Sequence, residues 1–371
     1  MRFPATLLFA VALAACGGAP GAGTSAGTAQ AGPSTELSPE INRLIAAAKS
    51  GGETDLDLAW GETTIGGGEA VKQFSTLFQK TYGFSVNMHF TPAPTMTQMA
   101  GKVAQEAAAG QKASTDIFLG SEGHFAALLQ QNGLESYDYT QLSPRIAKDT
   151  VVTNDIGLEI TSRFPGFSYN SNIIPEAQAP KTLADLLNPK WKGQLASEPN
   201  AASFDRVAFR PEWTPEKMRS YVQQLSGNIS GLIRCEELER LSSGEFALYG
   251  MDCGSFEVLR QREKGAPLAH VIPEDGALAV FFFVGIPRTA AHPDLAKLYI
   301  NLMMSEAGQK ILYDTSKGDL HSLPGSHSGA ELQDLQAKGI KPLAITPQFI
   351  IDHPEDVQLR DDLTKILTRK G

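Results

Sequence analysis

The sequence lacks the common motifs of catalysis. None of its 371 residues forms an H-E-x-x-H, G-x-S-x-G or P-loop pattern, the arrangements that place metal ligands, an activated serine or a phosphate cradle. Gly66-Gly67-Gly68 has neither the spacing nor the downstream lysine of a phosphate-binding loop. Because no catalytic acid, base or cofactor lysine stands in a recognisable group, the sequence indicates neither an enzyme nor a cofactor.

Positive charge is also scarce. The 41 acidic residues outnumber the 32 lysines and arginines, which gives a net charge of −9, and there is no basic run or basic amphipathic helix. This balance argues against a nucleic-acid-binding surface. The hydrophobic content of 42% allows a proper core, and the length suits two lobes of about 150 residues each.

The N-terminus carries one charge followed by an apolar run. Arg2 is the only charge before the apolar run from Ala5 to Ala15, which has the features of a signal peptide and is too short for a stable membrane anchor. No later segment is apolar over ~18 residues, so we predict no other membrane span. The run ends in Leu13-Ala14-Ala15-Cys16, which is similar to the bacterial lipobox, whose cysteine is lipidated (palmitate) and becomes the mature N-terminus. A coincidental cysteine after a secretory signal is the alternative.

Cysteine is rare, and its three positions predict a disulfide. Lipidation of Cys16 leaves Cys235 and Cys253 in an oxidising compartment. Cys235–Leu241 reads as a helix, and Phe246–Met251 reads as a strand. A helix of about nine residues rises ~13 Å and a returning strand of six covers ~20 Å, so the end of the strand returns near the start of the helix. Two buried free thiols are the alternative.

Strand and helix patterns alternate through the first half of the chain. We expect strands over Thr54–Trp60, Phe84–Phe90 and Thr115–Leu119, and helices over Ser38–Ser50, Glu69–Thr81, Thr95–Ala109 and Glu122–Gln131. This order predicts a parallel sheet with helices on both faces. Ligands of such sheets bind beyond the carboxyl ends of the strands.

Two extended segments indicate crossings between lobes. Gly157–Ser171 holds two extended pieces joined at Pro165-Gly166, and Ala277–Pro287 is a long apolar strand that returns. Pro180–Ala196 opens the second lobe with a short helix, capped by Thr182, and a turn into a strand. His321–Gly329 reads as a loop. We therefore expect a signal peptide at 1–15, the lipidated cysteine and a flexible tether at 16–35, the first part of lobe 1 at 36–162, lobe 2 at 163–275, a return to lobe 1 at 276–329 and a tail packed on the lobes at 330–371.

Four segments in this order carry a family resemblance: INRLIAAAKSGGETDLDLAW, KVAQEAAAGQKASTDIFLG, PKTLADLLNPKWKGQLA and HPDLAKLYINLMMSEAGQKIL. Over most of Pro39–Tyr313 the chain resembles the extracellular solute-binding proteins of ATP-driven importers, in their ferric-iron-binding branch. The resemblance implies an α/β, two-lobed, type 2 periplasmic binding protein with mostly parallel sheets and crossing hinge strands. It also implies a monomer, anchored by lipid in the periplasm or at the cell surface, that delivers a small solute to an ABC permease.

The ferric members of the family bind iron through an adjacent tyrosine pair with a His or Glu from the first lobe, because oxygen ligands suit a hard cation. This sequence has no adjacent tyrosines, only Tyr249 near the corresponding position, and offers Glu62 alone in the first lobe. We therefore expect an organic or anionic solute and no metal. A ferric-ion carrier, a ligand-sensing lipoprotein and an enzyme on the same fold are the alternatives.

Candidate ligand-binding residues lie at the expected strand ends and crossings. Trp60 could form the floor of a site or pack in the core. Threonines before a helix N-terminus suit an anion or simply cap the helix. Arginines could clamp an anion or pair with a neighbouring carboxylate. The full set is Trp60, Glu62, Thr63, Thr64, Ser121, Glu122, Arg163, Arg206, Tyr249 and Asp252.

The seven histidines are dispersed along the chain. His321 and His327 share one Gly/Ser/Pro loop, but no carboxylate or thiol is set with them as metal ligands usually are. We interpret this pair as part of a solvated loop.

Overall fold

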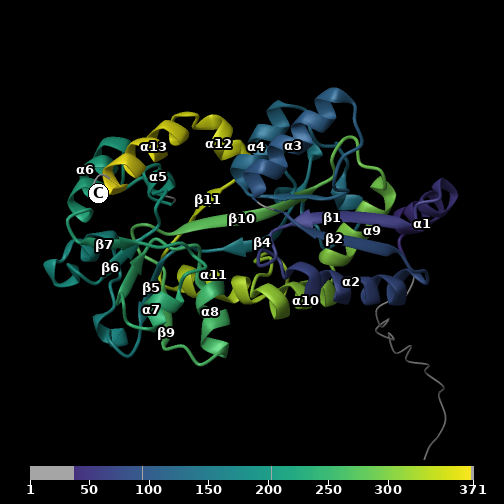
Figure 1. Ribbon diagram of the computed structural model, residues 1–371. Coiled ribbons are helices and arrows are strands. Elements are labelled where there is room, and N and C mark those ends of the chain that lie inside the picture. The colour runs from purple at the N-terminus through teal and green to yellow at the C-terminus, as the bar shows by residue number, and fades with distance from the viewer. Residues whose placement is uncertain (1–36, 94, 202, 369–371) are drawn as a thin grey trace, which may run out of the picture. The chain divides into compact units, whose positions relative to one another are not determined.

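The computed structural model describes residues 37–93, 95–201 and 203–368, and one compact unit begins at Ser38. Figure 1 shows this unit. The predicted signal peptide, Cys16 and the tether lie outside the described residues. Among the helices that the structure describes, none is long and apolar enough to span a membrane.

The first half of the chain alternates strands and helices as predicted. The elements are α1 (Pro39–Gly51), β1 (Asp55–Trp60), α2 (Gly67–Tyr82), β2 (Asn87–Pro92), α3 (Met96–Ala109), β3 (Phe118–Gly120) and α4 (Glu122–Gln130). Ser38 and Thr95 accept backbone hydrogen bonds as the N-caps of α1 and α3. Strands β1 and β2 pair in parallel, and a parallel bridge joins Leu58 to Ile117.

Strands β1 and β2 form a separate two-stranded sheet. Two strands carry the chain between its two larger sheets, a four-stranded first sheet that includes β3 and a five-stranded second sheet. Strand β4 (Leu158–Arg163) continues through Pro165-Gly166 into β5 (Phe167–Asn170), so the predicted crossing is confirmed. The return strand β10 (Leu278–Gly285) pairs antiparallel with both β3 and β4. Figure 1 shows β10 and β4 running through the middle of the compact unit.

The second sheet has the strand order β7-β6-β8-β5-β9. Its other strands are β6 (Leu195–Ser197), β7 (Ile229–Leu232), β8 (Leu248–Gly250) and β9 (Leu268–Val271). Strand β6 is parallel to β7 and β8, whereas β5 is antiparallel to β8 and β9. The sheet is thus more mixed than the sequence predicted, because the direction of β5 is set by the strand that enters from the first sheet.

The remaining helices are α5 (Phe204–Val207), α6 (Pro215–Leu225), α7 (Glu239–Ser242), α8 (Ser255–Glu263), α9 (Pro293–Met303), α10 (Glu306–Ser316), α11 (His327–Ala337), α12 (Pro347–Asp352) and α13 (Glu355–Thr368), with a last strand β11 (Leu343–Ile345). The predicted loop over His321–Gly329 is wrong at its end, because Ser326 caps α11 and the helix begins at His327. The predicted helix over Cys235–Leu241 is also too long, since α7 starts only at Glu239.

The segment Pro180–Ala196 is a scaffold element. Its helix is a 3₁₀ helix over Leu183–Leu187, and Thr182 and Asp185 cap it reciprocally. The indole nitrogen of Trp191 donates to the carbonyl of Asp185 over 2.9 Å. The side chains of Leu183, Leu186 and Trp191 belong to one buried cluster, so this segment presents its apolar face to the core of the second sheet.

The predicted disulfide between Cys235 and Cys253 is present, with the Cα atoms 5.9 Å apart. It closes a loop of 18 residues that carries α7 and β8. We expect the Cys235→Ser, Cys253→Ser double variant to lose about 3 kcal/mol of unfolding free energy, because the bridge restricts the unfolded chain. Urea unfolding with and without a reducing agent measures this. If reduction does not destabilise the wild-type protein, or destabilises the double variant equally, the bridge has no stabilising role.

Candidate functional site

The loop after β1 brings the first group of candidates together. Trp60 is only 2% exposed and its ring lies 5.6 Å from that of Phe90, so it packs in the core. Its Nε1 has no hydrogen-bond partner in the described structure. Glu62 accepts a hydrogen bond from the backbone of Gly68 over 3.1 Å and thereby stabilises the start of α2. Thr63 is exposed and Thr64 is partly buried.

The loop after β3 meets the second sheet's helix α5. Ser121 begins α4, and its hydroxyl lies 3.0 Å from Nδ1 of His124. Burial lowers the pKa of His124, so this imidazole is neutral near pH 7. Glu122 is 3% exposed and forms an ion pair with Arg206 of α5. The two residues were predicted separately for the two lobes, and the structure joins them.

Arg163 ends the crossing strand β4 and has unusual surroundings. Its guanidinium lies between the rings of Phe256 and Phe282, 3.9 Å from each centroid. It donates one hydrogen bond, to the carbonyl of Thr64 over 3.2 Å, and its Nε has no partner within the described structure. Burial lowers the pKa of Arg163 to about 9, which leaves it charged at pH 7.

A cavity of about 310 Å³ lies beside Arg163. Helix α8 begins at this cavity with Ser255, and no side chain caps its first turn; free backbone N–H groups there favour an anion. Arg262 and Lys317 add positive charge, although Lys317 pairs with Glu263 over 2.7 Å. The carboxylate of Asp319 also lines the cavity, but it already accepts the backbone N–H groups of α11's first turn.

Tyr249 and Asp252, both predicted to face the ligand, are buried in contacts of the protein itself. Tyr249 is fully buried and donates to Glu198 over 2.6 Å; burial raises the pKa of Glu198 to about 7. Asp252 accepts from the backbone of Gly166 over 2.9 Å and of Gly254 over 2.8 Å. It also contacts the hydroxyl of Ser168 and, at 3.2 Å, Nε2 of His270.

The model of the bacterial extracellular solute-binding proteins matches residues 69–340. The chain belongs to this family. Its similarity to the Fe(3+)-binding periplasmic protein of Serratia marcescens is 23% identity over 279 residues, which cover 69% of this chain and 78% of that protein.

Solved structures of similar fold agree with this family. Iron-bound HitA from Pseudomonas aeruginosa superposes with a TM-score of 0.66 at 19% identity and covers 84% of this chain and 99% of its own. AgtB from A. tumefaciens, in complex with agropinic acid, has a TM-score of 0.63 at 15% identity and covers 85% of this chain and 98% of its own. The predicted α/β fold of the two-lobed periplasmic binding proteins is therefore confirmed.

In this solute-binding protein, two contacts join candidate residues that lie far apart in the chain. Arg163 meets Thr64, and Glu122 meets Arg206. Tyr249 and Asp252 are held away in the second sheet, each with its own partners. The rings around Arg163, Phe256 and Phe282, were not among the candidates predicted from the sequence. Period-two alternation along β10 was a usable signal for Phe282, which lies on the opposite face from the buried Phe281 and Phe283.

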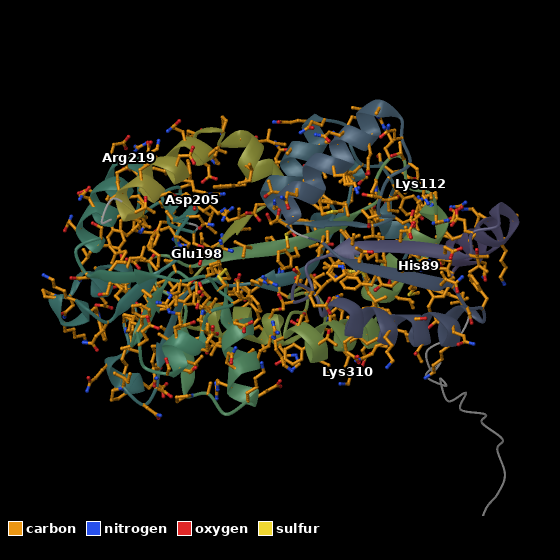
Figure 2. The ribbon with its side chains drawn as sticks, in the orientation of Figure 1. His89, Lys112, Glu198, Asp205, Arg219 and Lys310 are labelled. Carbon is orange, nitrogen blue, oxygen red and sulfur yellow. A yellow bond between two sulfur atoms is a disulfide. The ribbon has the colours of Figure 1, made fainter. Side chains whose placement is uncertain are left out.

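One group of side chains in the described structure has the composition of a metal site, namely Asp57, Asp116 and His292. Asp116 already accepts the backbone N–H groups of Asp57, Ala291 and His292. Asp57 lies 3.4 Å from Nζ of Lys112, which Figure 2 labels. These contacts give the group a structural role, and we assign it no metal.

The contacts of Asp252 predict that it stabilises the fold. We expect Asp252→Ala to reduce the unfolding free energy by about 3–5 kcal/mol, because it leaves buried donors and His270 without their acceptor. Asp334→Ala is the control, since its ion pair with Lys338 is exposed and worth under about 1 kcal/mol. Urea unfolding compares the two variants. An Asp252→Ala protein of unchanged stability that no longer binds solute would instead make Asp252 a ligand contact.

Proposed function

We propose that this solute-binding protein captures a small organic anion beside Arg163 and delivers it to an ABC-type importer. The observation that carries the proposal is the state of Arg163. It is a cation between two phenyl rings with no ion pair to any carboxylate in the part of the chain that the structure describes. A partly desolvated guanidinium in this position favours an anionic partner.

The surroundings of Arg163 support the same ligand class. The guanidinium is planar and can bind a carboxylate or phosphate through two parallel hydrogen bonds. Its Nε is buried and has no hydrogen-bond partner among the described residues. The uncapped start of α8 and the charge of Arg262 lie at the same cavity. The cavity of about 310 Å³ has the size of a small-molecule site.

The mechanism follows from the place of Arg163 in the chain. Its strand crosses between the two sheets, Thr64 belongs to the first sheet's side, and Phe256 lies in the first turn of α8 on the side of the second. A ligand held by groups from both sides stabilises the closed arrangement, which the permease recognises. Binding and closure need no covalent chemistry, so we propose no enzymatic activity.

Ferric ion is the second candidate, because the Serratia relative and HitA are named as iron proteins. In this chain, the phenol of Tyr249 is buried and bonded to Glu198, and Glu62 caps α2. Iron binding would require these contacts to break. The acid bound by AgtB shows that the fold accommodates an organic acid, which is the class that we favour.

The cellular role follows the family, with sensing as the alternative to import. We propose a monomer, tethered by residues 16–35 in the periplasm or at the cell surface, that serves an importer. A sensing lipoprotein would bind solute in the same manner and pass a signal to a membrane kinase. A permease gene and an ATPase gene beside this one would favour import, and a sensor-kinase gene would favour sensing.

Arg163 provides the test of the ligand class. We expect carboxylates or phosphate esters to raise the Tm of the wild-type protein, since a ligand at 100 times its Kd adds about 2.7 kcal/mol of stability. Arg163→Ala should weaken that binding at least tenfold, and Arg163→Lys should weaken it less, because lysine keeps the charge and loses the two-pronged geometry. A thermal-shift screen followed by calorimetry measures both.

The control for Arg163 is Lys310→Ala, which removes an exposed lysine that pairs with Asp314 on α10 and is labelled in Figure 2. It should bind the anion as the wild type does. The screen also includes Fe(III) citrate and spermidine. A response to ferric ion with no response to iron-free anions, or anion binding that survives Arg163→Ala, would overturn the proposal.

The lipid anchor depends on Cys16, which lies outside the described residues. We expect the full-length protein, expressed in bacteria, to incorporate labelled palmitate and to fractionate with membranes. Cys16→Ser should abolish both, because the thiol is the acceptor of the lipid. Equal membrane association of the two proteins would show that the lipobox-like sequence is not used.

A further inference from the structure

The C-terminal helices α12 and α13 lie beyond residue 340, where the match to the family model ends. Helix α12 packs against α4, which follows the first sheet's strand β3, and α13 packs against α5 and α6 of the second sheet. In Figure 1 these two helices, drawn in yellow, extend from α6 toward α4. The C-terminal segment therefore contacts helices on both sides of the crossing strands.

Helix α13 is firmly attached to the second sheet. Leu359, Leu363 and Leu367, at helical spacing, belong to the same buried cluster as Phe204 and Tyr221. Helix α12 also packs on this cluster through Phe349 and Ile350, and Ile350 lines a cavity of about 400 Å³ together with residues of α3 and α4. The segment thus packs on the second sheet's cluster and reaches across to α3 and α4.

A chain of charged side chains links α13, α5 and α4. Arg360 of α13 donates to Asp205 of α5 and lies 3.2 Å from Asp356. The neighbour of Asp205, Arg206, forms the ion pair with Glu122 of α4. Asp205, Asp356 and Glu122 are exposed by 0%, 1% and 3%. Asp205 and Arg219 are labelled in Figure 2 near α13.

We propose that α12 and α13 form a strap that holds the cleft of this solute-binding protein closed, and that the charged chain Glu122–Arg206–Asp205–Arg360–Asp356 is its latch. The closing motion itself rests on the proposed function. The strap adds a contact between the helices on the two sides of the crossing strands. The latch fixes α5 and thereby positions Arg206 for its ion pair with Glu122.

The charges of the latch make its hold depend on pH. Three carboxyl groups and two guanidinium groups leave one excess negative charge in a buried cluster, which favours the uptake of a proton. Burial and the neighbouring carboxyl of Asp205 raise the pKa of Asp356 to about 7. The other titratable group at the cavity is His124, whose pKa burial lowers. His353 ends α12, where its ring lies 4.5 Å from those of Phe209 and Phe349 and its Nδ1 lies 3.4 Å from Glu355. On α6, Arg219 forms an ion pair with Asp362.

The docking of the strap depends on pH because the pKa of Asp356 differs between the docked and the released strap. With the strap docked, the pKa of Asp356 is about 7; release of the strap from α4 exposes Asp356 to water, which lowers its pKa toward the ordinary value of an aspartate, about 3.9. Docking therefore takes up a proton between these values. The hold of the strap is complete at low pH, weakens as the pH rises toward 7 and is constant above that.

Hydrogen exchange of the ligand-free, full-length protein tests the strap. Rates over residues 347–358, corrected for the intrinsic effect of pH, give the opening of α12 and the first turn of α13. We expect at least tenfold more opening at pH 8 than at pH 5, and a larger radius of gyration by small-angle scattering at pH 8. Asp356→Asn keeps the shape without the charge and should remove this pH dependence while remaining compact.

Arg360→Ala should increase opening at both pH values, because it leaves two buried carboxyl groups without their cation. The matched control is Arg219→Ala, which removes the ion pair between α6 and Asp362 of α13 at a partly exposed position, 38% and 33% for the two side chains; it should behave as the wild type does.

A pH dependence that persists in Asp356→Asn, or an Arg360→Ala protein with unchanged exchange and radius, would overturn the strap. The sample contains no solute, so a failure of anion binding at Arg163 would not alter this result.

Discussion

The fold depends on a corner in which one strand leaves the first sheet and enters the second. The chain turns at Pro165-Gly166, and a Cβ atom at Gly166 would lie 2.3 Å from the carbonyl oxygen of Val271 and 2.9 Å from Nε2 of His270. Only glycine allows this approach. Asp252 accepts the N–H of Gly166, so the buried carboxylate that resembled a ligand contact in the sequence holds the corner between the sheets.

This corner also fixes the position of Arg163, the cation between the rings of Phe256 and Phe282. Arg163 ends the strand just before the turn, so it is fixed between the two sheets by backbone pairing with β10. Three other charged groups near the crossing have partners, since Asp252 pairs with His270, Glu122 with Arg206 and Lys317 with Glu263. Arg163 has aromatic rings and one carbonyl. Because Arg163, unlike these three groups, has no ion pair, a ligand of negative charge is favoured beside it.

The strap and the solute site both favour the closed arrangement, through different contacts between the two sides. The solute would add bonds at Arg163, and the strap stabilises the Glu122–Arg206 pair. A solute can shift the equilibrium only by its preference for the closed form. A strap that already favours closure lowers the amount of binding energy needed for closing and makes that amount depend on pH through the Asp205–Asp356 pair.

The sequence by itself determined the elements whose signals are local. Capping residues and apolar spacing located α1, α3 and the short helix after Thr182, and alternation located β1 and the strands around Pro165-Gly166. These elements depend on neighbours within a few residues, which a sequence records directly. The Cys235–Cys253 bridge spans 18 residues, and its prediction also used the number of cysteines and the expected compartment; the helix before it proved shorter.

Only the tertiary structure decided which candidate side chains have partners. Arg163 and Arg206 have the same two interpretations in the sequence. In the structure, Arg206 forms an ion pair with the buried Glu122, 84 residues earlier in the chain, whereas Arg163 packs against two phenyl rings. Tyr249 and Asp252 stand at a strand's carboxyl end but are buried by contacts with Glu198, Gly166 and His270. Such contacts join residues far apart in the chain, and their geometry arises only when both sheets and the C-terminal helices are packed together.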